Sequence, residues 1–432
     1  MTASDADSRI ALPSLTSLRW IAALLVFGYH LHVVEFFGPA ETGSALLHWT
    51  FGACAVGVSF FFILSGFVLM WSSPAPRARQ FWWRRVARVY PLHLATAGIV
   101  VLLLAIGPLA GKPSAAVTAA NLLLVQSWSP DIDYVQSLNT VSWTLSCEAF
   151  FYLAFPFIAA MVTRMRARHV TMLAVAAMST TILGPALGQL PASHAATTWF
   201  FHWNPLGRLP EFVLGVTLAA LVRAYHRHGR KAPAGLWIWA LTTATIGYAV
   251  VPLVPDPYRY AACTAPGFAL IIAAVAADDL ARRPTPLRNR ALIHLGELSF
   301  AFYLIHLIVI RIAETIIGYH PRLNDTAATT LTLATFAICL TAAALLHHWV
   351  EQPARTLLLR LRPGNVVQRP AASTERPKPA SPARDRHRRA ARSGLPAAAT
   401  AEACSAPGSP ETSKAGRRSA TPAPKKYPDD PG

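Results

Sequence analysis

The sequence predicts an all-α membrane protein, a bundle of about ten transmembrane helices with both termini in the cytoplasm. Three observations predict this class. Charged residues make up only 14% of the 432 residues, well below the roughly 25% that is usual in soluble domains. Apolar runs recur along most of the chain at about the 20-residue length that crosses a bilayer. Basic residues gather in every second connection between these runs.

Ten apolar stretches are the predicted spans. The fifth, sixth and eighth are the least regular, because glycine, proline or a charged residue interrupts them. In chain order, the spans cover residues 18–37, 51–72, 90–110, 141–162, 170–188, 207–225, 235–254, 261–277, 297–318 and 327–350.

The connections between the spans differ in charge. The four that follow even-numbered spans contain sixteen Lys and Arg residues, whereas the other five contain three. Because positive residues are retained on the cytoplasmic side, the basic connections are predicted to be cytoplasmic, and the even span count then places both termini inside. This pattern accounts for the net charge of +18, so no nucleic-acid partner is predicted.

The two ends of the chain are predicted to lie outside the bundle. Residues 1–13 form a short polar N-terminus without the features of a cleaved signal peptide, and residues 14–362 form the transmembrane domain. Residues 363–432 are rich in Pro, Ala, Ser and Arg and lack an apolar period, which predicts a disordered basic cytoplasmic tail. A solvated tail is favoured over a loose attraction to anionic lipids.

The five cysteines are scattered and form no C-x-x-C pair. We therefore predict neither a disulfide framework nor a metal site. No permanently bound cofactor is predicted, and the sequence indicates no oligomeric state.

The first span carries two residues that are costly in a bilayer, Arg19 and His30. Eleven residues correspond to about 20° past three full turns, so the two side chains share one helix face, roughly 16 Å apart along the axis. The topology puts Arg19 at the cytoplasmic surface and His30 beyond the midplane. A snorkelling arginine explains Arg19 alone, but the pair on one face favours a function.

A basic cluster precedes the third span in the stretch "FWWRRVARVYP", with Arg84, Arg85 and Arg88. Arg84 and Arg88 fall on one side of a helical turn. Guanidinium groups bind phosphates through two parallel hydrogen bonds. The charge rule for cytoplasmic connections explains the cluster equally well, so it does not name a ligand by itself.

A carboxylate, Glu148, lies about two turns into the fourth span, where it needs a partner. His30 is predicted at a similar depth. We therefore expect the carboxylate to orient the imidazole for general-base catalysis, with a structural ion pair or a proton relay as the alternatives. Ser142 and Trp143 are expected to support the outer end of this helix by hydrogen bonding or capping.

Two further pairs are spaced three residues apart, so their members are neighbours on a helix. Tyr303 and His306 lie at mid depth of the ninth span, and Arg208 and Glu211 are expected to pair at the outer mouth of the sixth. The arginines are predicted on the cytoplasmic side of the membrane, and the imidazole, the carboxylate and the phenol near or beyond its midplane. This pattern suits a donor whose anionic head stays in the cytoplasm. An acceptor would then approach from outside.

Five blocks of the sequence together resemble the acyltransferase-3 family of integral membrane acyltransferases. Their order and spacing match over most of residues 14–355. The blocks are R-x10-H (Arg19 and His30), "FFILSGFVL", "FWWRRVARVYP", "SWTLSCEAFFYLAFP" and "LGELSFAFYLIH".

The resemblance implies a ten-span core that moves acyl groups, commonly acetyl from acetyl-CoA, to hydroxyls of carbohydrates or secondary metabolites. It makes His30 the essential histidine and Arg19 its partner. It also assigns Glu148 as the motif carboxylate and gives the donor-side role to Arg84, Arg85 and Arg88. The family gives no role to Cys147, and we expect no fused extracytoplasmic hydrolase-like domain.

The predicted reaction places the phosphates of acyl-CoA on these arginines, with Arg19 near the entry and His30 as general base on the acceptor hydroxyl. A transient acyl-histidine is the competing route. The acceptor is a wall or exopolysaccharide sugar, or a glycosylated metabolite such as a macrolide. The alternative function is a proton-coupled transporter with His30, Glu148 and His306 as a relay, although no inverted repeat supports it.

Overall fold

The computed structural model describes residues 10–361 apart from 108, 110–112 and 190–193. In this part of the chain every regular element is helical, and the single β-bridge joins Phe37 to Leu323. The predicted all-α class is confirmed. The predicted tail, 363–432, and most of the predicted polar N-terminus lie outside the described residues.

Each predicted span corresponds to one long helix. The ten are α2 (Ser14–Val34), α4 (Gly57–Ser72), α5 (Ala78–Ile106), α8 (Trp143–Arg164), α9 (Ala167–Gln189), α11 (Pro205–Arg227), α12 (Leu236–Val250), α14 (Ala265–Leu280), α15 (Arg290–Ile317) and α16 (Asp325–Leu346). Shorter helices connect them: α3 (Thr42–Phe51), α6 (Ala115–Leu122), α7 (Ile132–Val135), α10 (His194–His202), α13 (Asp256–Arg259) and α17 (Gln352–Arg360). A π-helical segment, His347–Glu351, joins α16 to α17.

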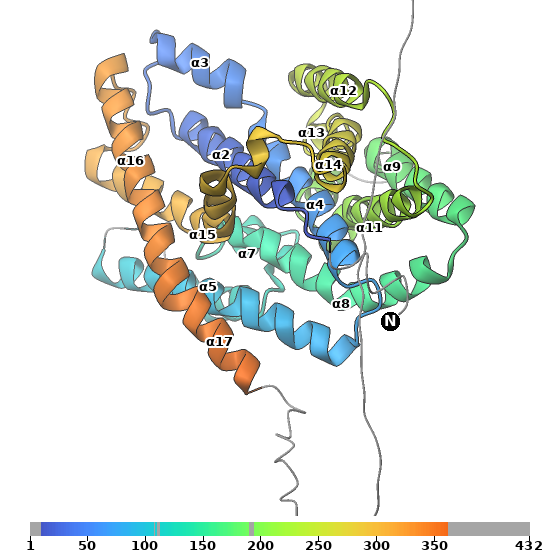
Figure 1. Ribbon diagram of the computed structural model, residues 1–432. Helices are drawn as coiled ribbons and strands as arrows, with labels where there is room; N and C mark the ends of the chain where they lie inside the picture. The colour runs from blue at the N-terminus through green and yellow to red at the C-terminus, as the bar shows by residue number, and fades with distance from the viewer. Residues whose placement is uncertain (1–9, 108, 110–112, 190–193, 362–432) are drawn as a thin grey trace, which may run out of the picture. The chain divides into compact units, whose positions relative to one another are not determined.

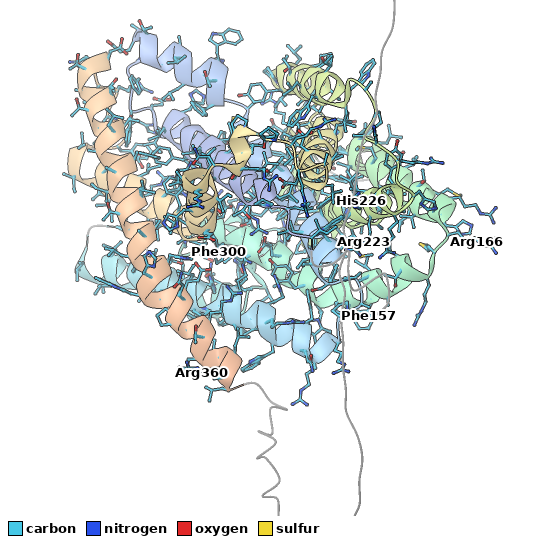
Figure 2. All side chains as sticks on the ribbon, viewed as in Figure 1. Phe157, Arg166, Arg223, His226, Phe300 and Arg360 are labelled. Carbon is cyan, nitrogen blue, oxygen red and sulfur yellow. The ribbon has the colours of Figure 1, made fainter. Side chains whose placement is uncertain are left out.

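Within the described residues, nine helical segments are long and apolar enough to cross a membrane. The eighth predicted span, 261–277, corresponds to α14, which has only 16 residues and is not among these nine segments. The chain is therefore a multi-pass membrane protein. Charged side chains such as Arg166 and Arg360 project near helix ends (Figure 2) and are exposed.

Helix α5 begins earlier than the sequence indicated. The apolar run starts at residue 90, but the helix starts at Ala78 and includes the whole "FWWRRVARVYP" stretch, with Pro91 inside it. The reason is that the first turns are amphipathic: Phe81 and Ala87 are buried, whereas Arg84 is exposed. The basic cluster therefore lies on a helix, and Arg84 points away from Arg85 and Arg88.

Helix α2 packs against α15, α4 and α3, and it lies between α3 and α15 in Figure 1. The backbone of Thr16 lies against Gly296, and farther along both helices the ring of His30 lies against that of His306. The two helices therefore run in the same direction, as the predicted topology requires of the first and ninth spans.

The first turn of α2 is anchored by Asp279 at the end of α14. The backbone N–H and the hydroxyl of Ser14 both donate to this carboxylate, at 2.9 and 2.8 Å. The hydroxyl of Ser17 donates to the carbonyl oxygen of Leu287 at 2.6 Å. These contacts hold one end of the helix on which Arg19 and His30 lie.

Candidate active site

A cavity of about 180 Å³ lies between α2, α4, α5, α8 and α15. We call it the central cavity. Its lining combines apolar side chains, mainly from α4, with ionisable groups from α2, α5, α8 and α15. The ionisable groups are Arg19, Arg85, Arg88, Glu148, Tyr152 and Tyr303.

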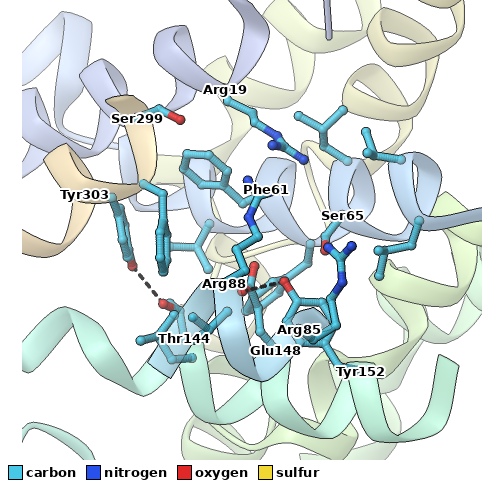
Figure 3. Close-up of a pocket in the computed structure, with 18 of the residues that line it drawn as sticks. Arg19, Phe61, Ser65, Arg85, Arg88, Thr144, Glu148, Tyr152, Ser299 and Tyr303 are labelled. Carbon is cyan, nitrogen blue, oxygen red and sulfur yellow. Dashed lines mark hydrogen bonds between the residues drawn. The ribbon is translucent and has the colours of Figure 1, made fainter. Parts of the chain in front are cut away.

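The charges of the central cavity are predominantly positive. Figure 3 shows Arg19 on one side, Glu148 and Tyr152 on the other, and Arg85 and Arg88 between them. The hydroxyl of Tyr152 donates to Glu148 Oε2 at 2.8 Å. One carboxylate faces three guanidinium groups, so the cavity favours an anionic ligand that accepts paired hydrogen bonds.

One of the predicted donor-binding arginines lies elsewhere. Arg84 is exposed and does not line the central cavity, whereas Arg85 and Arg88 do. Successive helix positions differ by about 100°, so neighbouring arginines cannot share one direction. The guanidinium of Arg85 is held over the rings of Phe81 and Tyr152, at 5.3 and 5.9 Å from their centroids.

A second hollow adjoins the central cavity on the side of the N-terminal segment. It has a volume of about 310 Å³ and is lined by residues 10–12, by the first turns of α2 and by the end of α4. Arg19, Val68 and Ser72 line both hollows. Arg19 is thus the charged residue shared by both spaces, as expected for a residue at an entry.

The two histidines form a contact that the sequence did not pair. His30 Nδ1 lies 2.8 Å from the carbonyl oxygen of Val26 and 3.1 Å from His306 Nε2. His306 Nδ1 lies 2.6 Å from the carbonyl oxygen of Tyr303 and 3.3 Å from that of Phe302. Both Nδ1 atoms face carbonyl oxygens, which only accept.

These partners assign the tautomers. Each Nδ1 carries a hydrogen, because a carbonyl oxygen cannot donate. His306 Nε2 is then a lone-pair acceptor for His30 Nδ1–H, and His30 Nε2 is left with a lone pair. A neutral imidazole with this nitrogen unprotonated is the form that a general base requires.

The histidine pair is connected to the central cavity through Tyr303. The rings of Tyr303 and His306 have centroids 5.8 Å apart, and those of His30 and His306 are 5.0 Å apart. The Tyr303 hydroxyl lies 3.1 Å from that of Thr144, and both residues line the cavity. His306 is fully buried, so the pair lies behind the wall that Tyr303 forms.

The expected hydrogen bond between His30 and Glu148 is absent from the described structure. His30 contacts Val26 and His306, and Glu148 is bonded to Tyr152. The prediction was wrong because equal depth along two helices does not fix the direction of their side chains. The actual partner of Glu148 follows it by four residues, a spacing that brings side chains together on one helix.

Ser142 and Trp143 support the local fold and do not line the central cavity. The Ser142 hydroxyl accepts from Asn121 Nδ2 at 3.2 Å and from Gln126 Nε2 at 3.4 Å. It does not cap α8, since no side-chain cap is present there. The Trp143 ring packs edge-on against His202 with centroids 5.3 Å apart.

Arg208 and Glu211 form an ion pair at 3.0 Å, and the structure places it inside the bundle. Both residues are 1% exposed, so they do not form an open mouth. Arg208 also donates to the hydroxyl of Ser59 at 3.0 Å. The pair therefore joins α11 to α4, where a buried charge needs such partners.

Five polar residues of the cavity were not predicted from the sequence: Ser65, Ser72, Thr144, Tyr152 and Ser299. Hydroxyl groups are common in membrane helices and carry no charge signal. Only Tyr152 had a usable signal, its spacing from Glu148.

Comparison with known proteins identifies the family of the chain. The model of the acyltransferase-3 family, described as an acyltransferase domain, matches residues 12–348. The matched segment contains every residue that lines the central cavity. It also contains both histidines.

The chain is similar to acyltransferase MdmB of Streptomyces mycarofaciens, with 40% identity over 386 residues that cover 85% of this chain and 98% of that protein. The peptidoglycan O-acetyltransferase OatA of Listeria monocytogenes is 27% identical over 34% of this chain and 24% of OatA. The exopolysaccharide production protein ExoZ of Rhizobium meliloti is 32% identical over 28% of this chain and 37% of ExoZ. No solved structure matches the chain.

Proposed function

Because this chain belongs to the acyltransferase-3 family and is a multi-pass membrane O-acyltransferase, we propose that it transfers an acyl group from acyl-CoA to a sugar hydroxyl. The proposed acyl group is acetyl. The proposed acceptor is a glycan or a glycosylated metabolite, and the proposed location is the cytoplasmic membrane. The single observation that carries the mechanism is the contact of His30 Nδ1 with the carbonyl oxygen of Val26, from which we assign the proton to Nδ1 and a lone pair to Nε2.

The donor is proposed to bind in the central cavity. Its phosphates bind to Arg19, Arg85 and Arg88, which line this space together. A guanidinium that forms two parallel hydrogen bonds with a phosphate fixes the orientation of the phosphate as well as neutralising its charge. Glu148, which accepts from Tyr152, holds the arginines in place as their counter-charge. The thioester then extends towards Tyr303 and the histidine pair.

Acyl transfer is proposed to occur in one displacement. His30 Nε2 removes the proton from the acceptor hydroxyl as its oxygen attacks the thioester carbonyl carbon. The new C–O bond forms and the C–S bond breaks, and His30 returns the proton to the leaving thiolate of coenzyme A. No group outside donor, acceptor and imidazole is needed.

His306 takes the role that the sequence assigned to the carboxylate. When His30 holds the extra proton, its Nδ1–H still donates to His306 Nε2. This bond orients the ring and spreads the positive charge that develops on it. His306 is itself fixed by the carbonyl oxygen of Tyr303, so its lone pair points at His30.

The acceptor class rests on the chemistry of the relatives. OatA is named for transfer to peptidoglycan and ExoZ for exopolysaccharide production, which are both carbohydrate polymers. MdmB aligns over nearly its whole length. We therefore propose a sugar hydroxyl as the reacting group, on a polymer or on a smaller glycosylated compound.

The proposal is tested by measuring the release of coenzyme A thiol from acetyl-CoA by purified protein. His30→Ala is expected to lower transfer by at least the 10²- to 10⁴-fold that general acid–base catalysis contributes, with the protein still present in the membrane. A turnover equal to the unsubstituted protein would refute the assignment of His30. Intersecting double-reciprocal plots support direct transfer, whereas parallel plots indicate an acyl-enzyme.

The role of His306 is tested by a matched pair of variants. His306→Gln keeps an acceptor oxygen and is expected to retain part of kcat. His306→Phe removes the acceptor and is expected to lower kcat as far as His30→Ala, with little change in the KM for acetyl-CoA. Equal losses in both variants would show that His306 acts only by filling space.

A further inference from the structure

A further cavity, separate from the two hollows described above and far larger than the central cavity, lies at the C-terminal end of α15. Its volume is about 1040 Å³, and it is bounded by the last turns of α15, the end of α5 and the segment 113–140. We call it the distal cavity. Its volume is just above the range of roughly 300–1000 Å³ that is typical of small-molecule sites. The donor-binding arginines do not line it.

The distal cavity contains a buried carboxylate with an unused oxygen. Glu314 is 4% exposed and lines the cavity. Its Oε2 accepts from Arg311 Nη1 at 2.6 Å. Its Oε1 is buried, and no described group lies within hydrogen-bonding distance of it. A buried acceptor without a partner costs about 1–3 kcal/mol, and a bound hydroxyl or ammonium group would remove that cost.

The charge of the distal cavity is opposite to that of the central one. Three carboxylates, those of Asp131, Asp133 and Glu314, line it with one guanidinium, that of Arg311. A phosphate-bearing donor is disfavoured there, since like charges repel. Besides the carboxylates, the lining includes Gln136, Thr140 and the phenol rings of Tyr134 and Tyr319. Such a lining offers hydrogen-bond acceptors and flat apolar surfaces to a ligand with several hydroxyls.

The histidine pair lies between the two cavities. On α15, Tyr303 lines the central cavity and Glu314 lines the distal cavity. His306 lies between them in the sequence, three residues after Tyr303 and eight residues before Glu314. Eight residues correspond to about 12 Å along the helix. On the other wall, Thr140 lines the distal cavity, and the carbonyl oxygen of the next residue, Val141, accepts from Tyr303 at 3.3 Å. Only a few residues therefore separate the two spaces.

We propose that the distal cavity is the acceptor site, and that Glu314 Oε1 accepts a hydrogen bond from a sugar that carries no negative charge. This inference rests on the proposed acyl transfer. It extends that function by assigning a place and a charge class to the acceptor: a neutral or amine-bearing glycoside binds, and a uronic acid does not. The reacting hydroxyl would extend from this cavity towards His30.

The test compares three acceptors that differ in charge: the methyl glycosides of glucose, glucosamine and glucuronic acid. With acetyl-CoA as donor, the first two are expected to accept acetyl and the third is not. In Glu314→Gln, the KM for the accepted glycosides is expected to rise about 10- to 100-fold, as expected when a hydrogen bond to a charged group is lost. The KM for acetyl-CoA is expected to stay constant.

Glu297→Gln is the matched control. Glu297 is on the same helix, is also three residues from a basic side chain (His294, at 3.5 Å) and lines neither cavity. Its substitution is expected to leave both KM values unchanged. Equal KM values for the acceptor in Glu314→Gln and the unsubstituted protein, or efficient transfer to the glucuronide, would overturn the acceptor site.

A second measurement does not depend on acyl transfer. Thr315 is exposed and lines the distal cavity, whereas Thr330 on α16 is exposed and does not. In Thr315→Cys, the glucoside and the glucosaminide are expected to slow maleimide labelling, whereas labelling of Thr330→Cys stays constant. Protection without any release of coenzyme A thiol would contradict the proposed function alone, and labelling that no glycoside slows would contradict the acceptor site.

Discussion

At the scale of single residues, the site depends on which arginine of a basic cluster points inwards. Arg85 and Arg88 line the central cavity and Arg84 is exposed. All three arginines are equally visible in the sequence, and the charge rule for cytoplasmic connections treats them alike. Only the packing of α5 against its neighbours distinguishes them.

This difference gives a prediction with an internal control. Arg88→Ala is expected to raise the KM for acetyl-CoA about 10- to 100-fold, because a charge-assisted hydrogen bond contributes roughly 1.5–3 kcal/mol. Arg84→Ala is expected to change it less than about twofold, as is usual for an exposed side chain. Initial rates against donor concentration, at a fixed acceptor concentration, measure both.

Arg88→Lys refines the result. Lysine keeps the charge but cannot form two parallel hydrogen bonds, so an intermediate KM is expected. If Arg84→Ala and Arg88→Ala weaken donor binding equally, the phosphates do not lie in the central cavity.

The residue types of the site could be predicted from the sequence, but their pairing could not. His30, Arg19 and Glu148 are conspicuous because ionisable groups are rare in membrane helices. Span depth then suggested that His30 and Glu148 meet, yet each bonds to a different residue. A hydropathy pattern fixes the position along a helix axis and leaves the rotation about that axis undetermined.

At the scale of helices, two glycines allow α4 and α11 to approach closely. A Cβ on Gly66 would clash with the carbonyl oxygen of Phe212, and one on Gly215 would clash with that of Ile63. Small residues at such contacts are the usual means of close packing in membranes, since lipid is as apolar as the side chains. The buried Arg208–Glu211 ion pair lies on α11, one of the two helices of this interface.

Gly66→Ala is therefore expected to destabilise the bundle by about 1–3 kcal/mol, the usual cost of overpacking. The measurement is the thermal unfolding midpoint of detergent-solubilised protein, followed by tryptophan fluorescence. The control is Gly98→Ala on α5, where a Cβ has nothing within 4 Å. That substitution is expected to leave the midpoint unchanged or raise it slightly, because alanine favours helix. A lower midpoint for Gly98→Ala than for Gly66→Ala would contradict this account of the interface.

At the scale of the whole molecule, the sequence predicted the order of the long helices because apolar length is a strong signal, but nine segments of the described residues, rather than ten, are long and apolar enough to cross a membrane. It was least effective where polar and apolar residues alternate. Helix α5 extends through the basic stretch to Ala78, and α14 is only 16 residues long. In both cases contacts with neighbouring helices, rather than apolar length alone, determine where the helix begins and ends.

The orientation of the bundle in the membrane is the last prediction, and the two-cavity mechanism depends on it. The proposed donor, acyl-CoA, is cytoplasmic. The N-terminal part of α5 and the first turn of α2, which are near the arginines of the central cavity, must therefore face the cytoplasm. The basic connection that contains Arg166 is then cytoplasmic, and the far end of the seventh span, where Leu253 lies, is outside. Both residues are exposed.

In intact cells, a membrane-impermeant maleimide is expected to label Leu253→Cys and not Arg166→Cys, with both labelled after permeabilisation. The unsubstituted chain gives the background from its own cysteines. The reverse pattern would place the arginine-lined cavity on the side without acyl-CoA and would exclude this route for the donor.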